Sequence, residues 1–401
     1  MKNFFKQINL IPIENTSTFK NVHLAQIFLL KINFFSFGKG FSKEEALTSA
    51  YGEMCERILT RNFLEEYYIP TLHKDAIITE RFLTQKLDDI YKIKELEKED
   101  LIDFNTDIFE ILSIPFINPK TEETVYFPIN LIQNLYASNG MAFHTDLKKA
   151  YYNAKTEIIE RFVKYEVVKY GLSLPKIDHP LNSDKIQIYD ATLGNKYPVI
   201  AALYKNHNEI ILSFGCDLNF ETAVKKAYLE LMQTSLKNTG KICEDIESVK
   251  DSANLIRHFI DLSGNIHSNF FKKPYFKTSK WNFKDLNVFK EDEFIRIYKY
   301  KNYQAVHLII PSISEVYPIE DLAYNNINRG KFIRADILNR TNKEYVLDYL
   351  NQHMVVDIGA FIGVKFDKHY FPQDIDELYE GYKFADSYLQ IQKLAKVLNE
   401  I

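Results

Sequence analysis

Apolar positions along this chain alternate between a two-residue and a helical period, which predicts repeated units of strand, turn and helix. The apolar, β-branched and aromatic run at 27–37 predicts a strand, and the Gly-Lys-Gly sequence at 38–40 predicts a turn after it. Ser42 and Glu45 then form a capping-box pattern at the start of a helix. The beginning of the chain therefore predicts one complete unit.

Two further units follow in the same order. Residues 128–136 predict a strand, which a Ser-Asn-Gly turn joins to a helix with Thr145 or Asp146 as its N-cap. Residues 185–204 and 209–215 predict two or three strands before a helix capped by Asn219.

The three predicted helices share one frame of small and charged residues. The first helix has Ala46, Ala50, Glu53, Glu56 and Arg57. The second set lies 104 residues later: Ala150, Ala154, Glu157, Glu160 and Arg161. The third lies 177 residues after the first, with Gln233 in place of the second Glu: Ala223, Ala227, Glu230 and Gln233. Each copy is preceded by Ser-x-Gly, at residues 36–38, 138–140 and 213–215.

This frame has a direct physical interpretation. Small Ala residues four positions apart let a helix lie close to a neighbour, and the first Glu then faces the same contact. Three such helices bring five carboxylates toward one place, where they repel unless they are protonated, paired with Arg57 and Arg161, or bound to cations. Mg²⁺ with a polyphosphate fits this set, because Mg²⁺ takes carboxylate and phosphate oxygens and the Arg guanidinium pairs with phosphate.

A simpler alternative is that Glu-x-x-Glu-Arg lies on solvated helix faces, where such residues form weak surface pairs. The recurrence of the pattern in one frame, each time after an apolar strand, favours a shared site.

Composition narrows the class of protein. The chain has 401 residues and a formal net charge of −4, so it lacks the basic surface of a dedicated nucleic-acid binder. It has neither an apolar run as long as a membrane span nor a signal-peptide pattern, and we expect a cytoplasmic protein. Its three cysteines are far apart and predict neither disulfides nor a zinc or iron–sulfur site; Cys216 alone lies where a helix N-terminus could stabilise a thiolate.

The remaining segments suggest the domain boundaries. Residues 73–112 are rich in Lys, Glu and Asp and predict a helical surface insertion. Residues 254–318 mix short strands with turns, and the chain beyond 319 is mainly helical in pattern. We therefore expect one domain over residues 1–315 and a mainly helical C-terminal region over residues 316–401.

At the three repeats the chain resembles the YcaO family, and the similarity extends over most of its length. Residues 38–57, 138–161 and 213–233 are similar to that family's three sequence motifs. The resemblance implies an α+β, YcaO-type fold of repeated strand-turn-helix units, built as layered sheets with helices, and a site for ATP and Mg²⁺. One branch of the family is associated with β-methylthiolation of an aspartate in a small-subunit ribosomal protein, as an accessory to a radical enzyme. Other branches activate peptide backbone amides with ATP.

The resemblance also implies roles for individual residues, although it identifies no catalytic residue. The metal ligands would be Glu53, Glu56, Glu157 and Glu160. The nucleotide and its phosphates would contact Ser49, Arg57, Arg161 and Lys226, and the wall of the site would be completed by Glu230 and Gln233.

Several positions depart from the family pattern. Lys149 replaces an acidic residue, which should lower metal affinity unless its side chain turns outward or binds phosphate. His144 and Thr145 also differ; His144 is either a loop histidine or a base. Lys226 replaces an arginine, which keeps the charge but loses bidentate geometry. The resemblance also implies an N-terminal segment with nucleotide contacts, whose counterpart we expect to be missing ahead of Met1.

Three functions remain open at this stage. The first is an ATP-binding accessory factor that works with a methylthiotransferase and a ribosomal protein, and the second is an ATP-dependent enzyme that modifies a peptide backbone as a cyclodehydratase or thioamide-forming enzyme does. The third is a degraded YcaO-like protein-binding module. The chain is not itself a radical transferase, because a radical cluster needs closely spaced cysteines. We expect a homodimer.

Overall fold

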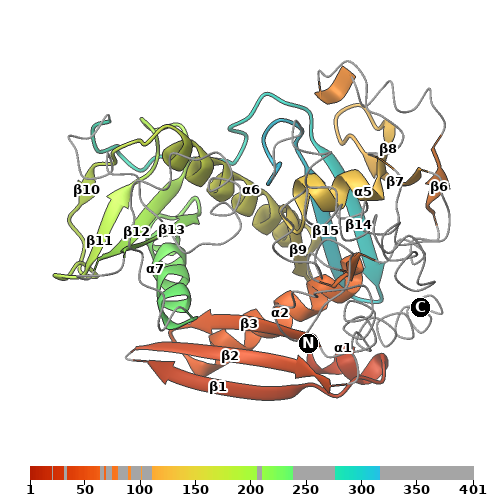
Figure 1. Cartoon of the computed structure of the whole chain (residues 1–401), viewed down its shortest axis with the longest axis horizontal. Helices are drawn as coiled ribbons and strands as arrows, with labels where there is room; N and C mark the ends of the chain where they lie inside the picture. Colours follow the sequence, from red (N-terminus) through yellow and green to blue (C-terminus); the bar gives the residue numbers. More distant parts are fainter. Residues whose placement is uncertain are drawn as a thin grey trace, which may run out of the picture.

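Three large antiparallel sheets and one two-stranded sheet make up the described part of this computed structural model, and a long helix directly follows one strand of each large sheet (Figure 1). The structure describes residues 1–19, 21–30, 34–63, 67–68, 75–79, 89–91, 101, 111–205, 210–237 and 276–316. The predicted α+β class and its repeated units are confirmed for these residues.

The first sheet has the strand order β1-β2-β3 and is covered by two helices. Its elements are α1 (Lys2–Gln7), β1 (Ile13–Phe19), β2 (Val22–Leu29), β3 (Phe34–Gly40) and α2 (Lys43–Thr60). The prediction of one strand over 27–37 is wrong, because Leu29 pairs with Phe34 in a hairpin between β2 and β3. Both arms bury alternate residues on one face, so the alternation alone does not show the reversal.

The predicted turn at 38–40 is also wrong. Gly38, Lys39 and Gly40 are the last residues of β3 and pair with β2. These glycines serve the packing of α2 on the strand, because a Cβ on Gly40 would lie 2.4 Å from Cβ of Glu45.

The second sheet has six strands in the order β6-β7-β14-β15-β9, with β8 paired to β7. Its elements, and those close to it in the chain, are β4 (Asn62–Phe63), β5 (Tyr67–Tyr68), β6 (Ile77–Ile78), β7 (Leu112–Ile117), β8 (Thr124–Pro128), α5 (Ile129–Leu131), the π-helix η3 (Ile132–Tyr136), β9 (Met141–His144), α6 (Leu147–Lys169), β14 (Phe294–Tyr300) and β15 (Tyr303–Ile309). The predicted strand at 128–136 is wrong, since the segment is helical. Its apolar side chains are buried all round, and such a run does not distinguish a strand from a buried helix.

The third sheet has the order β10-β11-β12-β13 and precedes the last described helix. The elements are β10 (Lys176–Ile177), β11 (Ile186–Asp190), β12 (Val199–Lys205), β13 (Ile210–Cys216) and α7 (Phe220–Lys237). The strands predicted in this region are confirmed.

The predicted helix caps are confirmed as well. Ser42 Oγ accepts a hydrogen bond from the Glu45 amide at 3.1 Å, and Asn219 Oδ1 accepts one from the Thr222 amide at 3.0 Å. Between Thr145 and Asp146 the structure selects Asp146, whose Oδ1 accepts from the Lys148 amide at 2.8 Å.

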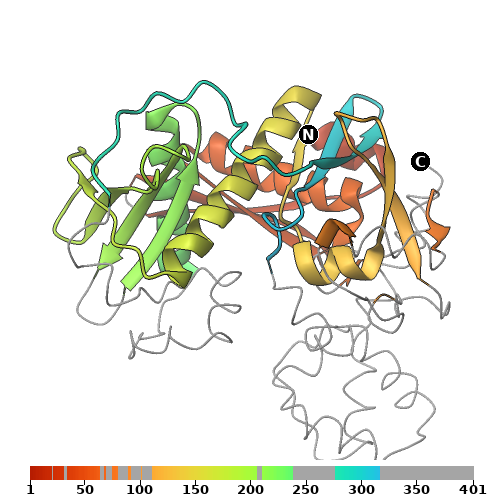
Figure 2. The same cartoon turned by 90° about the horizontal axis from the view of Figure 1, so that it is seen from above.

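The three long helices join the three sheets in a closed cycle. Helix α2 packs on its own strand β3 and on β9 and β15, α6 packs on β9, β15, β12 and β13, and α7 packs on β13, β12, β3 and β2. Figure 2 shows α6 running between the third sheet and α2. Each of these helices therefore contacts two of the three large sheets.

Some expectations fall on residues that the structure does not describe. Residues 317–401, with their predicted helices, and Cys243 lie outside it. Within the expected insertion at 73–112, the described strand β6 and the start of β7 belong to the second sheet. No helix among the described residues combines the length and apolar character of a membrane span.

Candidate functional site

The frame shared by the first and third repeats corresponds to one local structure. Ser36 Oγ donates to the carbonyl of Ala50 at 2.8 Å, and Ser213 Oγ donates to the carbonyl of Ala227 at 2.7 Å, each 14 residues apart. All four residues are buried. The Ser of the motif therefore holds the helix against the strand that precedes it.

The Gly of this motif allows the close approach. A Cβ on Gly38 would lie 2.1 Å from the Ala46 carbonyl oxygen, and a Cβ on Gly215 would lie 2.3 Å from that of Ala223. Both contacts are with helix backbone, which cannot turn aside as a flexible side chain does. Each strand and helix must therefore meet at a glycine.

The middle copy does not follow this arrangement. Ala142 in β9 occupies the position that lies 104 residues after Gly38, and Ser138 and Gly140 precede the strand. Gly140 instead approaches β15, where a Cβ would lie 2.1 Å from the Leu308 carbonyl oxygen. The Ser-x-Gly of the middle copy is thus a different contact from the other two.

The far end of α2 presents the first group of charges. Arg57 lies between two carboxylates, with its NH1 2.7 Å from Glu56 and its NH2 3.7 Å from Glu53. Glu53 Oε2 also accepts the Phe37 amide at 3.1 Å, at the edge of β3. A hydrogen bond to the Glu53 carboxylate therefore joins this end of α2 to β3.

The corresponding turn of α6 presents the second group. Arg161 pairs with Glu157 at 2.6 Å on the same helix. Glu160 Oε2 accepts the amide of Cys216 at 3.2 Å, which joins α6 to the end of β13. Glu53 and Glu160 thus make the same kind of contact, because each accepts a hydrogen bond from the backbone amide of a strand residue.

Lysines from two other elements complete the cluster. Lys39 at the end of β3 forms an ion pair with Glu230 of α7. Lys226 on α7 donates to the Cys216 carbonyl at 2.9 Å and pairs with Asp217 at 3.0 Å. We call the five glutamates and four cations of this region the acidic cluster: Lys39, Glu53, Glu56, Arg57, Glu157, Glu160, Arg161, Lys226 and Glu230.

The electrostatics show that the helices share this cluster. The pKa of Glu56 is raised to about 8, mainly by burial; Arg57 opposes this effect, and Glu157 of α6 and Glu53 add to it. Burial also raises the pKa of Glu160, with Glu157 adding to the effect and Lys226 and Lys39 opposing it. Glu56 of α2 and Glu157 of α6 are therefore close enough to interact, and the nearby cations offset only part of the effect of burial on Glu56 and Glu160.

The donor set suits Mg²⁺ bound together with a polyphosphate. Among the described residues, no group of three or more Asp, Glu, His or Cys side chains surrounds one point. Such a group is not required, because Mg²⁺ usually takes one or two carboxylates and completes its shell with water and phosphate oxygens. The carboxylate oxygens of the cluster can bind Mg²⁺, and its Arg and Lys side chains can bind the phosphate oxygens.

Four other residues singled out in the sequence lie outside the acidic cluster. Ser49 and Lys149 are exposed, and Lys149 makes no ion pair within the described residues. His144 ends β9, and its Nδ1 accepts the Asp146 amide at 2.8 Å, while Thr145 accepts a hydrogen bond from Gln304 at 3.2 Å. His144 is therefore a turn residue.

Two site residues escaped the sequence reasoning. Lys39, which the sequence predicted only as part of a turn, has a side chain that is 21% exposed and pairs with Glu230 of α7. Asp217, the partner of Lys226, had no motif to mark it. The alternative of a reactive Cys216 thiolate is not supported, because burial raises the pKa of its thiol well above the usual value.

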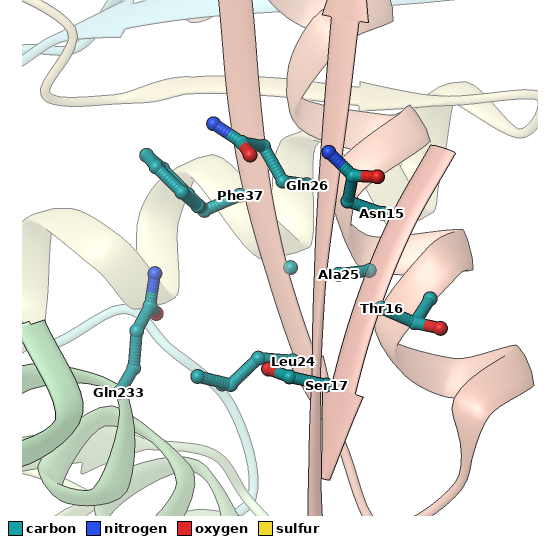
Figure 3. A pocket seen from close by; sticks show the side chains of 9 residues that line it. Asn15, Thr16, Ser17, Leu24, Ala25, Gln26, Phe37 and Gln233 are labelled. Atoms are coloured by element: carbon teal, nitrogen blue, oxygen red, sulfur yellow. The ribbon is translucent and has the colours of Figure 1, made fainter. Parts of the chain in front are cut away.

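A pocket of about 230 Å³ adjoins the cluster between the first sheet and α7 (Figure 3). Phe37 and Gln26 of the sheet and Gln233 of α7 lie on the same side of the strands. The lining contains no charged residue: Asn15, Thr16, Ser17, Leu24, Ala25, Gln26, Phe37, Gly38 and Gln233. Gln233 thus lies in this neutral pocket, one helical turn beyond Glu230.

Comparisons with known proteins identify the family. A family model described as "YcaO cyclodehydratase, ATP-ad Mg2+-binding" matches residues 37–293. An Escherichia coli protein named ribosomal protein S12 methylthiotransferase accessory factor YcaO is 31% identical over 383 residues, which cover 82% of this chain and 65% of that protein. A Haemophilus influenzae protein described as uncharacterized is 31% identical, covering 77% of this chain and 62% of that protein. The chain thus spans less than two thirds of the length of these relatives.

A solved structure shares the fold. It is the YcaO protein of Methanopyrus kandleri bound with AMPPCP and Mg²⁺, with a TM-score of 0.53 and 14% identity. The match covers 78% of this chain and 88% of that one.

Proposed function

The chain belongs to the YcaO family, and on this premise we propose that it binds ATP with Mg²⁺ between α2, α6 and α7. The observation that carries the proposal is the acidic cluster, in which carboxylates and cations of β3, α2, α6 and α7 lie together and burial raises the pKa of Glu56 and of Glu160. A magnesium nucleotide supplies the missing cation and gives the Arg and Lys side chains phosphate oxygens to bind.

The residues take distinct roles in this proposal. Metal would be held by Glu53, Glu56, Glu157 and Glu160. Phosphates would be bound by Arg57, Arg161 and Lys226, while Ser49, Glu230 and Gln233 would border the nucleotide. When bound, ATP supplies an activated phosphoryl group, and the Arg and Lys side chains of this chain would offset the negative charge that develops on its oxygens.

Binding is testable by calorimetry. The protein should bind ATP only when Mg²⁺ is present. Glu157→Ala should abolish binding, because Glu157 interacts with the buried carboxylates of Glu56 on α2 and Glu160 on α6. Glu166→Ala is a matched control on the same helix, beyond the cluster, and should bind as the unaltered protein does. Undiminished ATP binding by Glu157→Ala would exclude this site.

For the cellular role, we propose an accessory factor for β-methylthiolation of an aspartate in a small-subunit ribosomal protein. The support is the E. coli relative of that name, whose similarity covers 82% of this chain. The partners would be the methylthiotransferase and its ribosomal substrate. In this role the protein would be cytoplasmic and homodimeric, with residues 1–315 as its ATP-binding domain and 316–401 as a helical appendage.

Deleting the gene tests this role. The ribosomal aspartate should lose its methylthio group, as measured by mass spectrometry of purified ribosomes. Complementation with the Glu157→Ala/Glu160→Ala variant then separates the mechanisms. Rescue would favour a protein-binding module without ATP, whereas failure of a folded variant would favour a nucleotide-dependent factor.

A second candidate is an ATP-dependent enzyme that modifies peptide backbone amides. The observation that favours it is the match to a family described as cyclodehydratases. Fully modified ribosomes in the deletion strain would support this candidate over the accessory role.

A further inference from the structure

Strand β1 leaves one edge of the first sheet open. It pairs with β2 along its inner side, and within the described residues no strand pairs with its outer side. All seven of its residues are exposed, and Figure 1 shows the strand at the lower rim of the molecule. The backbone N–H and C=O groups of this outer side are therefore a template for pairing with another strand.

This edge lacks the features by which natural proteins prevent such pairing. Exposed edge strands usually carry Lys or Pro, or are bent by a bulge. The sequence of β1, IENTSTF, has neither Lys nor Pro, and its register with β2 runs without a bulge from Ile13 to Phe19. These two end residues are large and apolar, yet Ile13 is 46% exposed and Phe19 is 44% exposed. The strand is thus suited to receive a partner strand.

The sequence of β1 is complementary to itself. When two copies pair antiparallel about Thr16, each Ile13 lies opposite Phe19 of the second copy, and the two Thr16 residues face each other. A shift by two residues in either direction would instead place one of the apolar residues opposite a polar one. The remaining facing pairs can form hydrogen bonds and bring no like charges together: Glu14 with Thr18, and Asn15 with Ser17.

An apolar row of the sheet continues across this pairing. Ile13 lies opposite Phe28 of β2, and Phe28 lies opposite Phe35 of β3, so the three side chains share one face of the sheet. Phe19 lies opposite Val22 in the same way. The pairing joins the row of Ile13 to Phe19 and Val22 of the second copy, and the two-fold symmetry repeats this contact at the other end of the strand.

We propose that β1 is a homodimer interface, at which two copies of this chain pair edge to edge and their first sheets form one continuous sheet. The match of the strand to itself favours a second copy over an unrelated partner. Asn15 and Ser17 line the neutral pocket and face each other across the interface, so the two pockets of the dimer would lie side by side. This inference rests on the homodimer of the proposed function and identifies the surface that forms it.

A cysteine at the two-fold axis tests the pairing and its register. Facing Cα atoms of an antiparallel pair lie about 4.5 or 5.5 Å apart, within the roughly 4.4–6.8 Å that a disulfide allows. Thr16→Cys should therefore give a disulfide-linked dimer on mild oxidation, as seen by non-reducing electrophoresis. The unaltered protein is the control for its own cysteines, of which Cys55 and Cys216 are buried.

Two further cysteine variants check the register. Asn15→Cys and Ser17→Cys should each cross-link poorly alone, because each position faces the other one and not itself. A mixture of the two variants should cross-link as readily as Thr16→Cys. Equal cross-linking of Asn15→Cys alone would overturn the pairing about Thr16.

A charge at the edge tests the interface without a cross-link. Ile13→Lys places a lysine opposite Phe19 twice in each dimer and should raise the dimer dissociation constant by at least about tenfold, as measured by sedimentation velocity. Ile117→Lys is the matched control, because Ile117 is 49% exposed at the end of β7 in the second sheet. It should leave the dimer unchanged.

The outcomes separate this inference from the proposed function. If the unaltered protein is a dimer but Thr16→Cys gives no cross-link, the interface lies elsewhere and the homodimer stands. Equal dimerisation of Ile13→Lys and Ile117→Lys would also overturn the inference. A monomeric protein would contradict both the homodimer and this interface. The ATP site is not affected by either result, because calorimetry with Glu157→Ala tests it separately.

Discussion

The protonation of Glu56 makes the stability of the folded chain depend on pH. Its pKa is about 8 in the folded chain, because of burial and the neighbouring carboxylates, against 4.5 for an ordinary Glu. A proton on Glu56 therefore stabilises the fold below the ordinary pKa, and this contribution is lost as pH rises through about 8. Magnesium can replace the proton, since both neutralise the carboxylate.

We therefore predict that Mg²⁺ raises the melting temperature more at about pH 9 than at about pH 6. Glu56→Gln keeps the size of the side chain and removes the titrating group, so it should lessen both the metal effect and its dependence on pH. Melting curves at the two pH values, with and without Mg²⁺, provide the measurement. An equal metal effect at both values would contradict this view of Glu56.

Lys149 gives a second prediction at the scale of one residue. Its side chain is exposed at the start of α6, two turns before Glu157. Lys149→Glu should strengthen Mg²⁺-dependent ATP binding by less than about tenfold, because solvent screens an exposed charge. Calorimetry of the variant, with Lys148→Glu as the exposed neighbour, checks this. Weaker binding by Lys149→Glu would instead indicate that the lysine contacts phosphate.

Among the elements, the contact between a strand and its following helix depends on glycine in the first and third units. Gly38→Ala would place a Cβ 2.1 Å from backbone of α2, and the strand and helix would have to separate. We predict a loss of about 3 kcal/mol in the free energy of unfolding, measured by urea denaturation. Gly52→Ala is the matched control on α2. Its Cβ would meet nothing within 4 Å, so it should stabilise the chain by about 0.5–1 kcal/mol.

Equal free energies of unfolding for Gly38→Ala and Gly52→Ala would contradict this prediction, because they would show that α2 can shift away from the strand without loss of stability. The same prediction applies to Gly215→Ala, where the contact with α7 has the same geometry. It does not apply to Ala142, which already has a Cβ at the corresponding position of the middle copy.

In the whole molecule, the cycle of three sheets and three helices creates the site. Each helix packs on its own sheet and on the next one, and α7 returns to the first sheet through β2 and β3. The ion pair of Lys39 with Glu230 and the bond from Cys216 to Glu160 lie at two of the junctions. A ligand bound to the cluster would therefore contact groups from all three units.

The sequence by itself determined much of this arrangement. The helical spacing, the capping residues and the repeated Ala, Glu and Arg positions identified the three helices, and the motifs identified the family. These features are local, because periodicity and capping depend on residues a few positions apart. The two glutamates of α2 share one face of that helix, and so do the two of α6, because residues three positions apart lie on the same side of a helix.

Only the tertiary structure decided the rest. The reversal between Leu29 and Phe34, the helical turns at 129–136 and the neutral pocket are not encoded in local spacing. Lys39 and Glu230 meet across 191 residues, and Phe37 and Gln233 line one pocket from elements as distant. A buried apolar run is compatible with either a strand or a helix, so the packing of the sheets decides between them. Charged residues that are far apart in the sequence pair only when the cycle of sheets and helices has formed.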